Sequence, residues 1–396
     1  MAITSLTCPE PIARRQRVVA PDYDALHEAN ALFDEGQPEK ALRRTLDHLF
    51  PGREVPNLRD EPFSFVQGSS RVTVGIDGDE VTAKVPLVRL RDDSLTTAAL
   101  RYLLTDVSGI GVLFQPLLVG NDVHLVFRDR LARLHPQKVI EVLRQMPLRA
   151  DAKDDWLIEE FSCEPLERAP LDPLADDELE RAVSLWQTHW REVDELAKES
   201  QRKRSTFFFD EVAAYALYHV RQALPLHGYW WSRLSSASDT FNGNRVPMDD
   251  RERSLMKCAK EMVDLDADRL RNSLGHATYA ISPLSEGDER VLRHHLGPGN
   301  YLDAVMSVHN AGRYMDAAVA LVGTYCYLLA RYSWEAPIER LLLEGVKTAN
   351  GQAWRACASA LLAQSRKLMD ALDEDGEDDE LEEGEPEDAE NGEEEA

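Results

Sequence analysis

The sequence between Arg71 and Leu90 reads RVTVGIDGDEVTAKVPLVRL. Its first half alternates apolar residues with polar ones, and Asp77-Gly78-Asp79 interrupts the alternation with turn-forming residues. Apolar residues return from Val81 onward. A period of two on both sides of a glycine-containing turn predicts a β-hairpin with one buried face. We therefore expect an antiparallel sheet in the N-terminal half of the chain.

Helical patterns precede this hairpin. From Tyr23 to Phe50 apolar residues recur at helical spacing, with a break at Gly36-Gln37-Pro38, which predicts two antiparallel helices. The junction at residues 36–42 resembles the G-x-x-x-x-A junction of a tetratricopeptide helical hairpin, and residues 312–317 do so again. Because the two copies share no short period, we interpret both as helix hairpins and not as a repeat array.

Further elements follow the hairpin. A helix is predicted from Ser94, a good N-cap, to Ser108-Gly109. A second hairpin joins residues 112–119 to residues 123–127, and Pro136 begins the next helix. The predicted order of elements is α-ββ-α-ββ-α.

This order, over roughly residues 23–161, resembles the type III secretion chaperone fold and the related YbjN-like domains, in which helices cover a twisted antiparallel sheet. The resemblance implies an acidic, cytoplasmic, non-catalytic module that dimerises and binds extended segments of client proteins along apolar patches. We assign it to residues 22–163, after a flexible N-terminus at residues 1–21.

The second half has a different pattern. A Pro-rich, acidic linker at residues 164–176 ends the strand signals, and apolar residues then recur at helical spacing as far as Met369. We expect an all-α domain over residues 177–369. The predicted fold class is α+β: a small antiparallel-sheet domain, an all-α helical domain and a disordered acidic tail.

The tail dominates the charge. The formal net charge is -26, but 17 acidic residues and no Lys or Arg lie in residues 370–396, so the rest of the chain carries only -9. With almost no apolar residues to offset the entropy of ordering, residues 370–396 are expected to be disordered. A solubility role is the favoured interpretation, with mimicry of nucleic acid or binding to a basic partner as the alternatives.

Composition also bears on the compartment. The five cysteines are scattered and lack a C-x-x-C pair, which indicates reduced thiols in a cytoplasmic protein and no structural zinc. The N-terminus has no apolar core of signal-peptide length, and the apolar stretch at residues 317–330 is too short to span a bilayer. We interpret that stretch as a buried helix and expect no membrane association.

One short motif suggests chemistry. A helix predicted from Pro247 to Leu270 leads into Arg271-Asn272-Ser273-Leu274-Gly275-His276. This sequence resembles the R-x4-6-H motif of HEPN helical domains, many of which are metal-independent endoribonucleases. The resemblance implies that Arg271 is the motif arginine, Asn272 the polar residue often found after it, and His276 the catalytic histidine. It also implies a homodimer, since HEPN sites commonly combine two protomers. Tyr279 lies later than the family's usual aromatic residue.

The residue types suit cleavage of RNA through its 2′-hydroxyl, which needs a base with a near-neutral pKa and a cation for the charged phosphorane. Residues five apart in an unbroken helix point about 140° apart. We therefore expect Gly275 to adopt a left-handed conformation that ends the helix and brings His276 back beside Arg271. The alternative is that Arg271 only interacts with the helix C-terminus, and that His276 is an ordinary loop residue.

Two functions stay open on the sequence. In the first, the chaperone-like module binds a protein client or regulator and the HEPN-like domain cleaves RNA, in a toxin, stress or defence role. In the second, the protein is a non-catalytic chaperone or adapter. No cofactor or metal site is predicted, because adjacent histidines such as His294-His295 point about 100° apart in a helix and do not easily share one metal.

Overall fold

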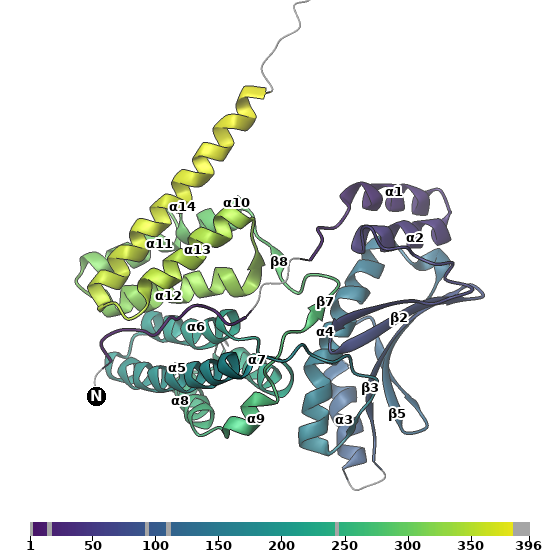
Figure 1. The fold of residues 1–396 in the computed structure, drawn as a ribbon, viewed down its shortest axis with the longest axis horizontal. Helices are drawn as coiled ribbons and strands as arrows, with labels where there is room; N and C mark the ends of the chain where they lie inside the picture. The colour runs from purple at the N-terminus through teal and green to yellow at the C-terminus, as the bar shows by residue number, and fades with distance from the viewer. Residues whose placement is uncertain (1–2, 14–17, 92–94, 108–111, 242–244, 383–396) are drawn as a thin grey trace, which may run out of the picture. The chain divides into compact units, whose positions relative to one another are not determined.

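A computed structural model describes residues 3–13, 18–91, 95–107, 112–241 and 245–382 (Figure 1). Its contacts divide the chain into two compact units. The sheet unit comprises Glu10–Gln201 and Val220–Ser285, and the helical unit comprises Met1–Pro9, Arg202–His219 and Glu286–Ala396. This division differs from the domain boundaries expected at residues 163 and 177, because both halves of the sequence contribute to the sheet unit.

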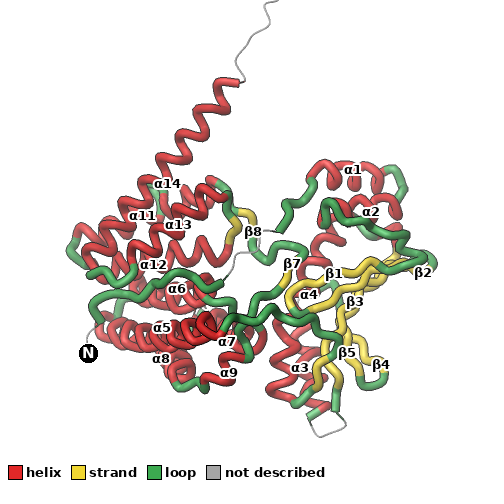
Figure 2. The backbone as a smooth tube through the Cα atoms, viewed as in Figure 1, coloured by secondary structure: helices red, strands yellow, loops and turns green. Residues whose placement is uncertain are grey.

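The sheet is antiparallel, and its strand order is β4-β5-β3-β2-β1-β7, with β6 paired to β3 (Figure 2). The strands are β1 (Phe63–Gly68), β2 (Ser70–Asp77), β3 (Glu80–Arg89), β4 (Gln115–Val119), β5 (Asp122–Arg130), β6 (Glu164–Pro165) and β7 (Thr278–Tyr279).

The hairpin predicted at residues 71–90 is confirmed as β2 and β3. Val74 lies opposite Ala83 and Ile76 opposite Val81, and all four side chains are buried. Gly78 has a φ of +58°, as the tight turn requires. Between these buried positions the strands place partly exposed or exposed residues, so one face of the sheet packs on the core.

Helices pack on the apolar face of the sheet and on one another. They are α1 (Tyr23–Asp34), which packs on α2 and α4, α2 (Pro38–Leu49), α3 (Thr96–Val107) and α4 (Pro136–Phe161). The long α4 contacts β1, β2, β3 and β5, while α2 packs against α4. The predicted hairpin of two N-terminal helices is confirmed, with Gly36 at a φ of +75° in its turn. The predicted N-cap Ser94 and the helix end at Ser108-Gly109 lie outside the described residues.

The sheet gains strands that the sequence pattern did not predict. β1 precedes the predicted hairpin, so three strands follow α2 where two were expected. The linker at residues 164–176 supplies β6, and its Leu166 and Ala169 are buried. The second half of the chain supplies β7, which pairs with Gln67 and Gly68 of β1. The predicted α+β fold class is confirmed: an antiparallel sheet with helices is followed by a mainly helical region, which adds a few two-residue strands.

The remaining helices of the sheet unit come from the second half. They are α7 (Gly228–Phe241), α8 (Met248–Val263), α9 (Ala267–Arg271) and most of α5 (Asp176–Lys203), while α6 (Thr206–Ala223) has residues in both units. The single helix expected from Pro247 to Leu270 is wrong. Asp266 caps a separate helix, because its carboxylate accepts the backbone N–H groups of Asp268 and Arg269.

The helical unit contains α10 (Glu289–Leu296), α11 (Tyr301–Asn310), α12 (Tyr314–Arg331), α13 (Ala336–Ala349) and α14 (Trp354–Glu382), with a short pairing of β8 (Ser285–Glu286) and β9 (Tyr332–Ser333). The buried helix predicted at residues 317–330 is confirmed within α12. Gly312, at a φ of +78°, turns α11 into α12 as the predicted hairpin requires.

The N-terminus is more ordered than expected in the described residues. Leu6 and Cys8, in the N-terminus expected to be flexible, are buried in the helical unit. At the other end α14 continues to Glu382, past the tail boundary expected at residue 370. Extending an existing helix costs far less than nucleating one, and Glu is a good helix former. Across the described residues, no helix combines the length and apolar character needed to cross a membrane.

Candidate functional site

The predicted motif residues lie at the end of α9 and in the segment after it. Arg271 ends the helix; its side chain is 42% exposed, and its Nη1 lies 2.6 Å from Oδ1 of Asp268. Asn272 is exposed at the C-cap. His276 is half-buried, and its backbone N–H and C=O pair with Asp172. The structure thus brings Arg271 to Asp268 and His276 to Asp172, in two separate contacts.

The predicted role of Gly275 is wrong. Its φ is not positive, and the helix has already ended at Arg271. Gly275 instead allows close packing: a Cβ there would lie 3.0 Å from Cβ of Leu171, and its N–H donates to the carbonyl of Pro225. The motif segment therefore runs extended beside residues 225–227.

The cations near the motif already have carboxylate partners. Arg269 pairs with Glu159 at 3.1 Å, and its guanidinium also lies over the ring of Trp230. Arg271 pairs with Asp268. A phosphate group would have to compete with these carboxylates for both arginines.

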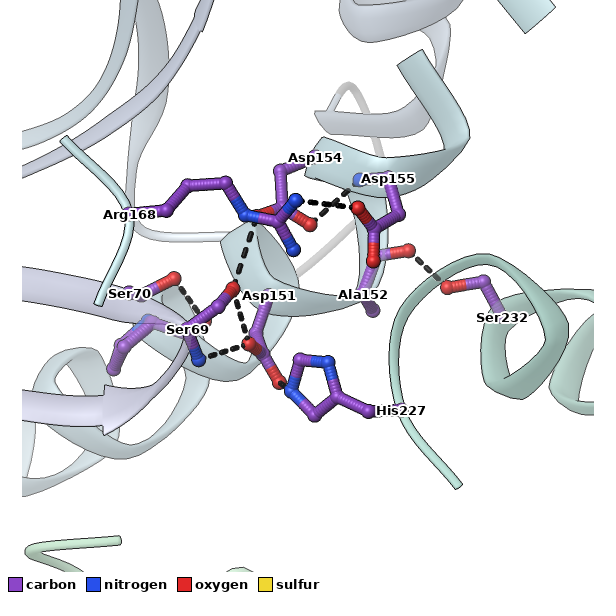
Figure 3. A network of polar contacts seen from close by, with 10 residues as sticks. Ser69, Ser70, Asp151, Ala152, Asp154, Asp155, Arg168, His227 and Ser232 are labelled. Atoms are coloured by element: carbon purple, nitrogen blue, oxygen red, sulfur yellow. Dashed lines mark hydrogen bonds and ion pairs between the residues drawn. The ribbon is translucent and has the colours of Figure 1, made fainter. Parts of the chain in front are cut away.

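The motif segment adjoins a buried ionic cluster within the sheet unit. His227 donates its backbone N–H to the carbonyl of Ser273 at 2.8 Å, and its side chain enters the cluster. We define the buried ionic cluster by six residues from four separate segments: Ser69, Asp151, Asp154, Asp155, Arg168 and His227 (Figure 3). The segments are the β1–β2 turn, α4, the predicted linker and the loop before α7.

Asp151 accepts two hydrogen bonds from Ser69 and forms an ion pair with His227. The backbone N–H and the hydroxyl of Ser69 lie 2.5 Å and 2.7 Å from its Oδ1, and Nε2 of His227 lies 2.9 Å from its Oδ2. Burial opposes ionisation of this carboxyl, but the positive charge of His227 and the bonds from His227 and Ser69 outweigh burial. The pKa of Asp151 is therefore held below its ordinary value.

Asp154 has a different environment one turn along α4. Its Oδ2 lies 2.9 Å from Oγ of Ser69 and 2.9 Å from Nε of Arg168, and the residue is only 3% exposed. Burial raises the pKa of Asp154 to about 7, since Arg168 does not offset burial together with the negative charges of Asp155 and Asp151. Burial lowers the pKa of His227, but Asp151 outweighs that effect, so the net shift is upward.

Two glycines make room for the cluster. Gly228 has a φ of +64°, and a Cβ there would overlap the carboxylate of Asp155. Gly68 has a φ of +65°, and a Cβ there would overlap the carboxylate of Asp151. Both positions combine a backbone conformation that favours glycine with a close approach to a charged group.

The cluster contains Ser, His and Asp but lacks the arrangement of a hydrolase triad. The hydroxyl of Ser69 contacts the two carboxyls, while His227 contacts Asp151. Ser69, Asp151, Asp154 and His227 are all buried, which leaves a substrate no access. In the described part of the chain no group of three or more His, Cys, Asp or Glu side chains is arranged to hold a metal ion. The cluster therefore joins segments of the chain that are far apart in the sequence.

A second feature of the sheet unit is exposed and apolar. Five of the seven large apolar side chains that are exposed among the described residues fall between residues 95 and 119. We name these the β4 edge patch: Leu95, Leu104, Leu113, Leu118 and Val119. Leu104 is 60% exposed, Leu118 48% and Val119 56%. β4 is the terminal strand of the sheet and pairs only with β5 in the described structure.

Sequence patterns missed both features. The cluster residues are up to 158 positions apart, and the acidic residues of α4 look like an ordinary solvated helix face. The β4 residues were correctly assigned to a strand, but nothing local indicated that this strand would end the sheet.

A scan against protein-family models finds no match, and a search of curated proteins finds no similar sequence. The geometry of the two features is therefore the basis for a functional proposal.

Proposed function

We propose that the protein is a non-catalytic adapter that binds an extended apolar segment of a protein client at the β4 edge patch. The observation that carries this proposal is the coincidence of exposed leucines with a sheet edge that has no further strand among the described residues. A strand edge with unpaired N–H and C=O groups is a template for another strand, and natural proteins usually protect it. Large exposed apolar patches commonly mark interaction sites.

The hydrogen-bonding groups of the edge follow from the turn. β4 and β5 are joined by a two-residue turn in which Gly120 has a φ of +61°, so Val119 and Asp122 form its closing pair. Alternation then directs the backbone groups of Pro116 and Leu118 away from β5. Leu118 offers both an N–H and a C=O to a client strand, whereas Pro116 offers only a C=O.

The apolar groups lie on both faces of this edge. Leu118 is opposite Val123, whose buried side chain faces the helices, and α3 with Leu104 contacts β4. Val119 points to the other face, as successive strand residues do. A client strand with apolar residues at alternate positions would bury its side chains against Leu104 and Leu118.

A displayed library of unstructured peptides, selected on the full-length protein, tests this proposal. We expect enrichment of peptides with alternating apolar residues, and binding measured by fluorescence anisotropy that Leu104→Asp weakens at least tenfold, about 1.4 kcal/mol. Val19→Asp is the matched control, because Val19 is also apolar and 66% exposed but lies outside the patch. Equal binding by both variants, or no enrichment, would overturn the proposal.

The ribonuclease function remains the competing hypothesis. The carboxylate partners of Arg269 and Arg271 favour the adapter, because they reduce the positive charge available to a phosphate. Incubation with RNA in EDTA separates the two functions. Cleavage by the wild-type protein that His276→Ala abolishes would establish the nuclease and refute a purely non-catalytic role.

A further inference from the structure

The hydroxyl of Ser69 contacts two carboxyls but has one proton to donate. It lies 2.7 Å from Oδ1 of Asp151 and 2.9 Å from Oδ2 of Asp154. A hydroxyl supplies one donor and two acceptor lone pairs. If both contacts are hydrogen bonds, one carboxyl must itself carry a proton and donate it to Oγ of Ser69.

The surroundings favour Asp154 as the holder of that proton. Both carboxyls accept a backbone N–H and face a cation, His227 at Asp151 and Arg168 at Asp154, but Asp154 is only 3% exposed and lies near the carboxyls of both Asp151 and Asp155. The chain of bonds then runs from the Asp154 carboxyl to Oγ of Ser69, and from the Ser69 hydroxyl to Asp151.

We propose that the buried ionic cluster is a proton-dependent latch, in which a proton held on Asp154 below neutral pH keeps the predicted linker and the loop before α7 fastened to α4. The proton passes to solvent when the cluster opens, and no other group is consumed. This latch is independent of the adapter function, since it involves no residue of the β4 edge patch.

Charge balance supports a bound proton. Three carboxyls from α4 face two cations, Arg168 from the linker and His227 from the loop before α7. β7 adds the hydroxyl of Tyr279, whose pKa is raised chiefly by burial and then by Asp151, while Arg221 acts in the opposite direction. One proton on Asp154 leaves the cluster with equal numbers of positive and negative charges.

The latch holds specific segments. Arg168 bonds Asp154 and Asp155, and the nearby Ala169 N–H donates to the carbonyl of Ser69 at 2.8 Å. His227 bonds Asp151 and, through its backbone, Ser273 in the motif segment. Opening the cluster would release the linker and the loop together.

The stability of the closed cluster should decrease as pH rises. The folded pKa of Asp154, about 7, lies above its ordinary value of 3.8, so this carboxyl stabilises the closed cluster at low pH. That stabilisation is lost as pH rises toward 7, and the opening constant increases about tenfold per pH unit over this range. The pKa of Asp151 is lowered, so its contribution to stability changes with pH only below the ordinary pKa. The pKa of His227 is raised from 6.5, so its contribution changes mainly above pH 6.5.

Infrared difference spectroscopy of the full-length protein at pH 6 tests where the proton resides. We expect a C=O stretch of a buried protonated carboxyl that is lost in Asp154→Asn and kept in Asp155→Asn. The neutral amide of Asp154→Asn still donates to Ser69, so this variant should unfold at a higher urea concentration than Asp151→Asn, which loses the negative charge that faces His227. Persistence of the band in Asp154→Asn, or a lower midpoint for Asp154→Asn than for Asp151→Asn, overturns the assignment.

Hydrogen exchange of the wild-type protein tests the latch without any substitution. After correction for intrinsic exchange rates, the amides of Ala169 and His227 should open about tenfold more often per pH unit between pH 5 and 7. The amide of Ile76, which donates to Leu58 elsewhere in the sheet unit, serves as the control and should show a smaller slope. A slope at Ala169 and His227 no larger than that at Ile76 would refute the latch.

Discussion

The two edges of the sheet are built in opposite ways. At the β1 edge, Gln67 is completely buried; its Nε2 donates to the carbonyl of Ile281 at 2.7 Å, and its Oε1 accepts the N–H groups of Ala280 and Ile281 at 3.0 Å each. The buried ionic cluster lies directly after this strand. At the β4 edge the described structure has no further strand, and leucines are exposed.

At the β1 edge, buried polar groups with fixed partners hold one particular neighbour. At the β4 edge, apolar side chains leave the backbone groups available to another strand. Buried amides and carboxyls are costly unless their partners are in place, so the β1 edge accepts only one neighbour. The β4 edge presents backbone groups and apolar side chains that do not require one particular partner. It is therefore suited to a partner that binds and dissociates. Each of the following substitutions tests one side of this contrast.

The largest effect is expected for Gly228→Ala. The new Cβ would adopt a left-handed backbone conformation and overlap the carboxylate of Asp155, and we expect a loss of about 4 kcal/mol in the free energy of unfolding by urea. Gly120→Ala, in the β4–β5 turn, is the control, since its φ is +61° but no atom lies within 4 Å of the new Cβ. A loss of about 1 kcal/mol is expected there. Similar losses in both variants would show that overlap with the cluster is unimportant.

The next effect concerns the amides of the two edges. Gln67→Ala leaves two backbone N–H groups and one C=O near β7 without their partner, and we expect a loss of about 3 kcal/mol. Gln115→Ala removes an exposed amide from β4, and we expect a change within about 0.5 kcal/mol. Urea unfolding measures the free energy that each variant loses. Equal losses would contradict the proposed difference between the two edges of the sheet.

A smaller effect is expected from the pH dependence of His227. Its pKa is raised in the folded protein, so its stabilising effect is complete below the ordinary value of 6.5 and is lost as pH rises through the folded pKa. The unfolding free energy of the wild-type protein should therefore fall between pH 6.5 and 9 more steeply than that of His227→Gln. Parallel profiles would indicate that His227 is neutral throughout.

The smallest effect on stability is expected for Leu118→Lys. A charge on an exposed edge strand discourages pairing with another strand, so sedimentation should detect less self-association or client binding than in the wild type. The unfolding free energy should change by less than about 0.5 kcal/mol. A large loss of stability would mean that Leu118 belongs to the core.

Local periodicity accounts for the parts of the fold that the sequence predicted. The hairpin at residues 71–90 and the helix beginning at Pro136 each carry their own pattern of buried residues. β1 was missed because Gln67 occupies a buried position, which breaks the apolar alternation that Phe63 and Phe65 begin. β7 was missed because two residues carry no period, and its partner strand β1 is more than 200 positions away.

The local geometry predicted for the motif segment is wrong, and the sequence itself contains the reason. Asp266 is a good N-cap residue that precedes Ala267 and Asp268, and this signal divides the helix before Arg271 is reached. Gly275 was interpreted as a helix terminator, whereas close packing against Leu171 explains it. The roles of Arg271, Asn272 and His276 in catalysis remain predictions that the RNA assay addresses.

The closure of the β1 edge has a consequence for synthesis of the chain. A ribosome delivers residues 63–68 long before residues 278–281, so Gln67 awaits its partners while some 200 further residues are made, and Asp151 awaits His227 for 76. Contacts of such sequence separation form late and slowly. A recombinant fragment that stops at residue 163 would be arrested at that stage, and soluble fragments of the sheet unit should need to extend to about residue 285.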